Sequence, residues 1–369
     1  MQLFKQQTAM RFMGHRLILA MGLSGNLMIV SAGLAQSTDS IGVAVNVPKN
    51  TVITTVTVGN DPSGIVVSPD SKTAYVVNYQ SSSVSVLDAT NGYAVKATAS
   101  VAAYPGDLAI SPDGTTLYVS CWGNPGIVDV VDTTQPTYPV KTTLTAGAYP
   151  NGLAVTPDGK ALYIANRGDP YESIQGTVSV FNTSTYKLTT ITTPGNPLSL
   201  VFTNQGKQAD VLNTGGTGYL QFIHTVSGQI SSLTAAGGQI FFPRGIVSDR
   251  SATTLYITSE YNYVTVCNAR TGNVTNQFLV SPNIDTEMDL GQPAATPNGE
   301  YVYVPYAFNV TAAENVNQVA MFDVGTGKIV GTPIPTGKTP TWAQMAPNGR
   351  ALYVANAGDG TVTVIDTAP

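Results

Sequence analysis

The side chains that could carry chemistry in this chain are carboxylates and arginines, because histidine is almost absent. The 369 residues include two histidines, His15 and His224. Ser-His-Asp triads, Cys-His pairs and multi-histidine metal sites all need a histidine beside their other members. His224 occupies a position where similar segments of the chain carry Asp or Asn, so we interpret it as a turn residue. We therefore predict no catalytic residue of these classes, no metal site and no cofactor.

Carboxylates are the remaining candidates for acid–base chemistry. Asp107 or Glu260 could act as acid or base, and Arg244 could stabilise developing negative charge, as hydrolysis of a lactone or ester requires. No spacing singles out a pair. The segment SPNIDTEMDLGQ adds three alternating carboxylates, Asp285, Glu287 and Asp289. The segment lacks the glycine and spacing of a calcium loop, so we interpret it as a solvated connector.

These residues lie within a phrase that the chain repeats seven times. Weaker copies begin at Pro197, Pro243 and Leu290. The phrase recurs about every 45 residues, a period typical of the four-stranded blade of a β-propeller. Seven copies predict seven blades. The strongest copies read PSGIVVSPDSKTAYVVN from Pro62, PGDLAISPDGTTLYVSC from Pro105, PNGLAVTPDGKALYIAN from Pro150 and PTWAQMAPNGRALYVAN from Pro340.

The composition and the ends of the repeat predict one all-β domain over residues 51–369. Hydrophobic residues make up 43% and charged residues 11%, with 36 Gly and 23 Pro between short runs of Val, Ile, Thr and Tyr, as in all-β proteins. The last copy ends at Pro369 after three strands. The run TVITTVTV, from Thr51 to Val58, is similar to the outer strands of the other copies. We predict that this strand completes the seventh blade and closes the ring, which removes an exposed sheet edge.

The first 35 residues are typical of a secretory signal peptide. Lys5, Arg11 and Arg16 precede an apolar stretch from Leu17 to Ala35 that ends in small residues, as such peptides do. Residues 36–50 follow as a polar lead-in. The alternative is an uncleaved membrane anchor, since the stretch just reaches the ~18 residues needed to span a bilayer. We expect cleavage near Ala35, no stable membrane span afterwards, and a periplasmic, secreted or cell-surface location.

Charge and cysteine content narrow the partners and cross-links. The signal segment holds three of the 17 Lys and Arg and none of the 22 Asp and Glu, which leaves 14 basic against 22 acidic residues. Such an acidic surface disfavours nucleic acid as a partner.

Cys121 and Cys267 fall in different blades, beyond the ~7 Å reach of a disulfide, so we predict two unpaired thiols. Cys267 is expected in the core, whereas Cys121, near a loop, could alternatively oxidise or form an intermolecular bridge.

The repeated phrase resembles the YVTN repeat of seven-bladed propellers found in archaeal surface-layer proteins and bacterial periplasmic proteins. The resemblance rests on endings such as YVVN from Tyr75 and YVAN from Tyr353, and it covers nearly the whole chain after the signal segment. It is shared, more distantly, with the haem d1 propeller of nitrite reductases and with lactonase-type propellers. It implies an extracytoplasmic binding or scaffolding protein. One periplasmic relative binds single-stranded DNA, which the acidic charge here makes a poor match.

Propeller geometry predicts where a site would lie. The start of each innermost strand and the end of each second strand open on one face, around the central channel. Arginine offers a forked donor there and tryptophan a flat apolar face. Alternatively, Arg244 and Glu260 pair within the fifth blade, and Trp342 fills the channel wall. Seven residues at or just beyond these positions depart from the Gly, Ser or Asn of the repeat and are the candidate ligand-binding residues: Asp107, Trp122, Arg167, Arg244, Glu260, Tyr306 and Trp342.

Function is predicted only as a class. We favour a monomeric, non-catalytic extracytoplasmic module that binds a protein, glycan or small ligand on the channel face. Two longer segments on that face are predicted to be recognition loops, NRGDPYESIQGT from Asn166 and PYAFNVTAAENVNQ from Pro305, because binding residues gather on loops of rigid scaffolds. The alternatives are a lactonase-type or other hydrolase that uses channel-mouth carboxylates, and a structural surface-layer component.

Overall fold

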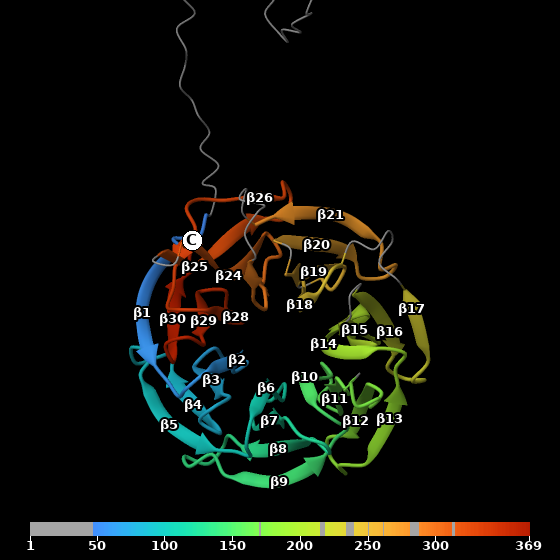
Figure 1. Cartoon of the computed structure of the whole chain (residues 1–369). Coiled ribbons are helices and arrows are strands. Elements are labelled where there is room, and N and C mark those ends of the chain that lie inside the picture. Colours follow the sequence, from blue (N-terminus) through green and yellow to red (C-terminus); the bar gives the residue numbers. More distant parts are fainter. Residues whose placement is uncertain are drawn as a thin grey trace, which may run out of the picture. The chain divides into compact units, whose positions relative to one another are not determined.

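Seven β-sheets stand around a ring in the part of the chain that the structure, a computed structural model, describes (Figure 1). That part comprises residues 47–369 except 170, 215–217, 234–239, 250, 261, 281–287 and 312–313. The predicted signal segment and most of the polar lead-in lie outside it. The fold is the predicted seven-bladed β-propeller, and each sheet forms one blade.

The blades follow one another in sequence, and in most of them four antiparallel strands run in order from the channel to the rim. Blade 1 has β2(Pro62–Val67), β3(Thr73–Asn78), β4(Ser83–Asp88) and β5(Val95–Ser100); blade 2 has β6(Pro105–Ile110), β7(Thr116–Cys121), β8(Ile127–Asp132) and β9(Val140–Thr145). Blade 3 has β10(Pro150–Val155), β11(Ala161–Asn166), β12(Thr177–Asn182) and β13(Leu188–Thr192); blade 4 has β14(Asn196–Thr203), β15(Gln208–Thr214), β16(Tyr219–His224) and β17(Ile230–Leu233). Blade 5 has β18(Pro243–Ser248), β19(Thr254–Ser259), β20(Tyr263–Asn268) and β21(Val274–Leu279).

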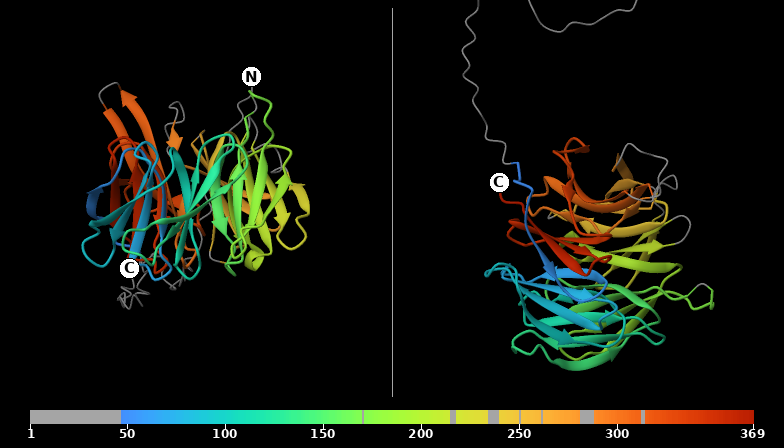
Figure 2. Two further views of the ribbon diagram at one scale, coloured as in Figure 1. Left: turned by 90° about the horizontal axis from the view of Figure 1, so that it is seen from below. Right: turned by 60° about the vertical axis from the view of Figure 1, so that its left-hand side comes forward.

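Blade 6 departs from the pattern. Its innermost strand is split into β22(Asp289–Leu290) and β23(Ala294–Ala295), and its outer strand into β26(Lys328–Ile329) and β27(Ile334–Pro335). Between them, β24(Tyr301–Thr311) and β25(Glu314–Asp323) form a long hairpin that extends beyond the neighbouring strands (Figure 2). The prediction of a loop from Pro305 was therefore wrong: the register continues through Ala307↔Asn317 and Phe308↔Val316, because a run rich in β-formers prolongs the ladder.

The ring closes as predicted, through the two ends of the propeller. Blade 7 consists of β28(Pro340–Met345), β29(Ala351–Asn356) and β30(Thr361–Asp366), and β1(Thr51–Thr57) supplies its outermost strand. β1 pairs antiparallel with β30, from Thr51↔Asp366 to Thr57↔Thr361. Val56 and Val58 pack against the core that blades 7 and 1 share. An N-terminal strand thus covers an edge that β30 would otherwise expose.

The cores lie between blades. One cluster joins Tyr75 and Val77 of blade 1 to Leu108 and Val119 of blade 2, and similar clusters fill the other junctions. The second strands are therefore covered on both faces; every residue of β3 is buried. This explains their near-continuous Val, Ile, Leu and Tyr content. Each blade thus depends on its neighbours for a buried face.

Both cysteines are free and buried, in blades 2 and 5, as the sequence predicts for two unpaired thiols. Burial raises the pKa of Cys121 to about 12, with the nearby Asp129 carboxylate adding to the shift. Cys121 is only 1% exposed. A buried thiol of such high pKa stays protonated and inert, so the alternative of a reactive Cys121 was wrong.

The turns between first and second strands carry a side-chain acceptor as well as the Pro and Gly of a type I turn. In blade 2 the Ser111 hydroxyl donates to Asp113 at 2.5 Å, and the Thr115 backbone N–H donates to it at 3.0 Å. These hydrogen bonds, the serine's first, lower the pKa of Asp113.

We expect Asp113→Ala to lower the free energy of unfolding by about 1 kcal/mol, because it leaves the Ser111 hydroxyl and the Thr115 N–H without this acceptor. Urea titration of the purified protein measures the effect. Asp113→Asn is the matched control, since its amide oxygen retains one acceptor, and it should lose less. An equal loss in both variants would show that the negative charge, rather than the acceptor, matters.

Candidate ligand-binding site

The inner-strand starts and second-strand ends meet at one end of the ring, as the cross-strand pairs Pro62↔Asn78, Pro105↔Cys121 and Pro340↔Asn356 show. We call this end the channel face. Each inner strand begins at the channel face and each second strand ends at it. The predicted residues, which lie at these strand ends, are therefore found on the channel face.

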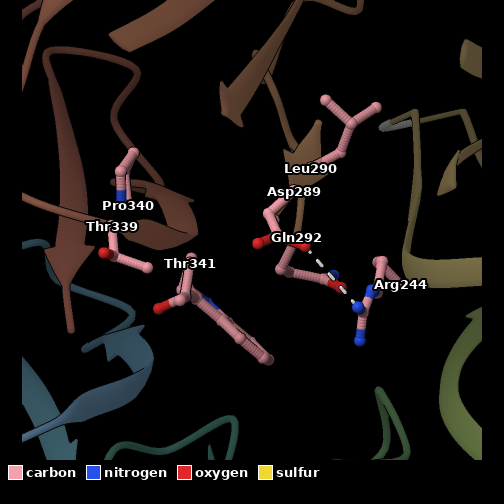
Figure 3. A pocket seen from close by; sticks show the side chains of 9 residues that line it. Arg244, Asp289, Leu290, Gln292, Thr339, Pro340 and Thr341 are labelled. Carbon is pink, nitrogen blue, oxygen red and sulfur yellow. Dashed lines mark ion pairs between the residues drawn. The ribbon is translucent and has the colours of Figure 1, made fainter. Parts of the chain in front are cut away.

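A pocket of about 340 Å³ opens on the channel face between blades 5, 6 and 7 (Figure 3). It lies near the lower end of the ~300–1,000 Å³ range of small-molecule sites. Two predicted residues, Arg244 and Trp342, line it. The remaining lining residues come from the inner strands of blades 6 and 7 and the turn before β28: Asp289, Leu290, Gly291, Gln292, Thr339, Pro340 and Thr341.

Charge at the pocket is set by Arg244 and Asp289, which line it, and by Glu260, which pairs with Arg244 outside the lining. The Arg244 Nη2 lies 2.5 Å from a Glu260 carboxylate oxygen and 3.6 Å from Asp289 Oδ1. The three side chains are between 37% and 75% exposed, so the pairs contribute little to stability. Together they carry one net negative charge. The predicted pairing of Arg244 with Glu260 is present, whereas sequence reasoning had assigned Asp289 to a solvated connector and missed its place beside the arginine.

The broken inner strand of blade 6 shapes the pocket floor. Gly291 passes so close to Thr341 that an added β-carbon would collide with its carbonyl oxygen. Gln292 then pairs in parallel with Trp342 of blade 7, through Gln292 N–H to Thr341 O at 2.9 Å and Ala343 N–H to Gln292 O at 3.0 Å. The Gln292 side-chain amide also bonds both backbone groups of Ile246 in blade 5. Three blades are thereby fixed around one pocket.

Trp342 presents an incompletely paired indole. The ring packs against the core of blades 7 and 1 and lines the pocket. Its Nε1 is buried and has no hydrogen-bond partner among the described residues. An unsatisfied buried donor costs about 1–3 kcal/mol, whereas the part of Trp342 that lines the pocket is open to a ligand.

The other predicted residues do not line this pocket. Trp122 is half-buried and packs edge-to-face on Tyr149 at 5.8 Å. Arg167 is half-buried at the end of β11, where its carbonyl accepts from Asn196. Tyr306 is 4% exposed in the blade 6 core, and its hydroxyl donates to Gln318.

Asp107 joins two blades. Its carboxylate accepts from the backbone N–H of Leu108 at 2.7 Å and, across the junction, from that of Leu153 in blade 3 at 3.3 Å. The side chain is buried, and desolvation raises its pKa to about 7 despite these two hydrogen bonds. The polar contacts are therefore directed into the junction between blades.

The structure tests only some of the remaining predictions about catalytic and metal-binding residues. His224 ends β16, and its backbone closes the following turn with Gln229. Asp285 and Glu287 lie outside the described residues. Within those residues no group of three or more His, Cys, Asp or Glu side chains could hold a metal ion. A search of the same residues finds no helix that is long and apolar enough to cross a membrane.

Comparisons with known proteins agree on the class of fold, a seven-bladed β-propeller. Residues 47–202 match the family described as Lactonase, 7-bladed beta-propeller. The chain is similar to hydrazine synthase of Kuenenia stuttgartiensis, with 22% identity and a TM-score of 0.69 over 91% of this chain and 99% of that one. It is also similar to the Cps50 (Swd1) propeller domain of Myceliophteria thermophila, with 13% identity and a TM-score of 0.69 over 86% of this chain and 99% of that one. No curated protein matches.

The family match covers β1 to β13 and most of β14, and so the first three blades. Arg244, Asp289 and Trp342 lie beyond residue 202 and thus outside the matched segment. The resemblance to the narrower YVTN group stays a prediction.

Proposed function

We propose that this propeller is a non-catalytic binding module whose ligand occupies the channel-face pocket between Arg244 and Trp342. The observation that carries the proposal is a pocket that Trp342 lines together with an arginine and an aspartate. An indole face, an exposed carboxylate and a guanidinium together suit a neutral, hydroxyl-rich ligand such as a sugar. The apolar C–H face of the sugar ring would pack on the indole, and the sugar hydroxyls would form hydrogen bonds with the charged side chains.

The charge arrangement supports binding over acid–base catalysis. Glu260 and Asp289 both lie beside the Arg244 guanidinium, so neither is a carboxylate set apart for acid–base work. Their oxygens can accept hydrogen bonds from ligand hydroxyl groups. The single net negative charge of Arg244, Glu260 and Asp289 also disfavours a strongly anionic ligand.

We expect Trp342→Phe to weaken binding of a neutral sugar about tenfold while the melting temperature changes little, because phenylalanine retains an apolar side chain but offers the sugar a smaller ring face. Neutral mono- and disaccharides are first screened by thermal shift, since a ligand of the native state raises its melting temperature. Any hit is then titrated by calorimetry against the wild type, Trp342→Phe and Arg244→Gln.

Trp122→Phe is the matched control, since Trp122 is also half-buried on a propeller turn but does not line the pocket. A sugar that binds the wild type and the Trp342→Phe variant equally would contradict the proposed site. If no sugar in the panel raises the melting temperature, sugars are excluded as the ligand class, and a peptide or protein partner would have to be sought.

A lactonase-type hydrolase is the second candidate, favoured by the family match over residues 47–202. Glu260 or Asp289 would act as base and Arg244 would stabilise the developing oxyanion. Turnover of a panel of lactones that is lost in Glu260→Gln would establish it; no turnover, with or without divalent ions, would exclude it.

The basic and apolar N-terminal segment supports an extracytoplasmic location for either function, and N-terminal sequencing of the exported protein would test cleavage near Ala35.

A further inference from the structure

A second pocket lies at the opposite end of the ring, at the junction between blades 4 and 5. At four other junctions this corner is closed by a proline of one blade packed on a turn glycine of the next. The contacts place Pro69 on Gly114, Pro112 on Gly159, Pro157 on Gly206, and Pro297 on Gly349. The repeat thus has a standard way of filling the corner.

Both members of that contact are replaced between blades 4 and 5. Asn204 stands in the proline position and Ala252 in the glycine position of the repeat. The blade 4 turn also changes hand: Gln205 and Gly206 have φ values of 57° and 81°, and Lys207 N–H bonds to Asn204 O. Positive φ at both central residues is typical of a type I′ turn, unlike the Pro-Asp turns of blades 2 and 3.

The tyrosine that normally reaches across a junction is replaced as well. In blade 3, the Tyr163 hydroxyl lies 3.4 Å from Thr225 O in the last turn of blade 4. In blade 4, Asp210 occupies the tyrosine position, and the Gln208 amide instead donates to Ala269 O, the equivalent carbonyl of blade 5, at 2.9 Å. A phenol ring has thus been exchanged for smaller polar groups.

Asp210 organises the wall of the opened corner. Its carboxylate is fully buried and accepts from Thr203 at 2.8 Å and from Gln208 at 2.5 Å. Desolvation raises its pKa to about 6, against those two hydrogen bonds. Thr203 and Gln208 themselves line the pocket, so the buried carboxylate fixes the orientation of two lining side chains.

The result is a pocket of about 510 Å³ whose described lining residues mostly have polar side chains and include one charged residue, Arg270. The Arg270 guanidinium makes no ion pair within the part of the chain that the structure describes. None of those lining residues has a carboxylate or an aromatic ring. The lining comes from the two inner turns and the last turn of blade 5: Thr203, Asn204, Gln205, Gln208, Ser251, Ala252, Thr253, Asn268, Ala269 and Arg270.

The hydrogen-bonding capacity of this lining is mixed. Gln208 donates both amide hydrogens to protein oxygens, which leaves its carbonyl oxygen as an acceptor. The Ser251 and Thr253 hydroxyls bond to Asp249 and to each other, so both hydroxyl hydrogens are used within the turn and the remaining lone pairs can accept. The side-chain amides of Asn204 and Gln205 lie in the pocket lining and supply both donors and acceptors.

We propose that the junction between blades 4 and 5 is a second binding site, specific for a monoanionic, hydroxyl-rich ligand of the sugar-acid class. Arg270 pairs with the ligand carboxylate as a forked donor. The amides and hydroxyls of the two turns bond the ligand hydroxyls. Recognition here depends on hydrogen bonds and one charge, whereas the channel-face pocket offers an indole ring and net negative charge. The site does not depend on the proposed function of the channel face.

The test is an NMR titration of the full chain with galacturonate, glucuronate and gluconate, with galactose and acetate as probes that carry only one half of the chemistry. We expect saturable binding of at least one sugar acid, and weaker binding of both half-probes. Arg270→Ala should weaken the sugar acid about tenfold or more, as loss of a charged hydrogen bond does. Arg350→Ala, which removes an exposed arginine in the turn between β28 and β29 of blade 7, should leave binding unchanged.

A second variant closes the corner without touching the charge. Replacing Asn204-Gln205 by Pro-Asn gives blade 4 the Thr-Pro-Asn-Gly turn that blade 6 has at Thr296–Gly299, adds no charge, and should abolish sugar-acid binding while Arg270 remains. Arg244→Gln should have no effect. No binding of any sugar acid, binding that survives Arg270→Ala, or binding that is lost with Arg244→Gln would each overturn the proposal. If the grafted turn fails to fold, the two arginine variants still decide.

Discussion

Replacing Asp107 by asparagine should remove a pH dependence of stability that runs opposite to the usual one for a carboxylate. Asp107 has a pKa near 3.8 when solvated and about 7 in the folded protein. Between these values the folded state holds a proton that the unfolded state releases. The free energy of unfolding should therefore be highest below pH 3.8 and fall as the pH rises to 7, by about 4 kcal/mol from this residue alone.

The measurement compares wild type and Asp107→Asn by urea unfolding at several pH values between 4 and 8. Surface carboxylates with lowered pKa values, such as Asp70, Asp113 and Asp158, stabilise the fold above pH 4 and lose that contribution as the pH falls. They are common to both proteins and cancel in the difference. If the difference in free energy of unfolding between the two proteins stays constant from pH 4 to 7, then the hydrogen bonds from the Leu108 and Leu153 N–H groups outweigh the desolvation of the Asp107 carboxylate.

A chain that begins at Gly59 should lose most of its stability, because it lacks β1. The truncation leaves the outer edge of β30 from Thr361 to Asp366 unpaired, while its inner edge stays paired with β29, and it removes Val56 and Val58 from the core of blades 7 and 1. We expect a loss of about 5 kcal/mol or more, comparable with the whole stability of many domains. The exposed edge should also promote aggregation.

Denaturant unfolding and analytical ultracentrifugation check both effects. The control is a chain that begins at Val47 and retains β1; its stability should equal that of the longer protein. A synthetic peptide of residues 47–58, added to the truncated chain, should restore part of the loss if pairing with β30 is the cause. Equal stability of the two chains would show that closure contributes little.

The fold could be predicted from the sequence because the repeat states the same local information seven times. Pro-Asp-Gly turns, buried second strands and the missing fourth strand of the last copy agree with one another, and agreement across levels is what specifies a fold. Blade 6 was harder. Its inner strand breaks at Gly291 and Gln292, where a backbone contact with Thr341 replaces the usual ladder, and nothing in the local sequence encodes that partner.

The candidate site was predictable in position more than in chemistry. Departures from the repeat did indicate Arg244, Glu260 and Trp342, and the structure brings Arg244 together with each of the other two. The same reasoning could not separate Asp107 and Tyr306, whose polar atoms bond to protein groups, from residues open to a pocket. The second pocket was missed because the residues that open it belong to two different copies of the repeat. Asn204, Asp210 and Ala252 each depart from the repeat, but only the folded structure brings them together.

Closure of the ring by β1 and β30 also separates the seventh blade from the others in how it can fold. β1 precedes the other strands of the propeller along the chain and β30 follows them. Blades 1 to 6 are built from neighbouring segments, whereas blade 7 needs two strands that lie about 300 residues apart in sequence to meet. Because long-range contacts form slowly, completion of blade 7 is expected to be the slowest step of folding.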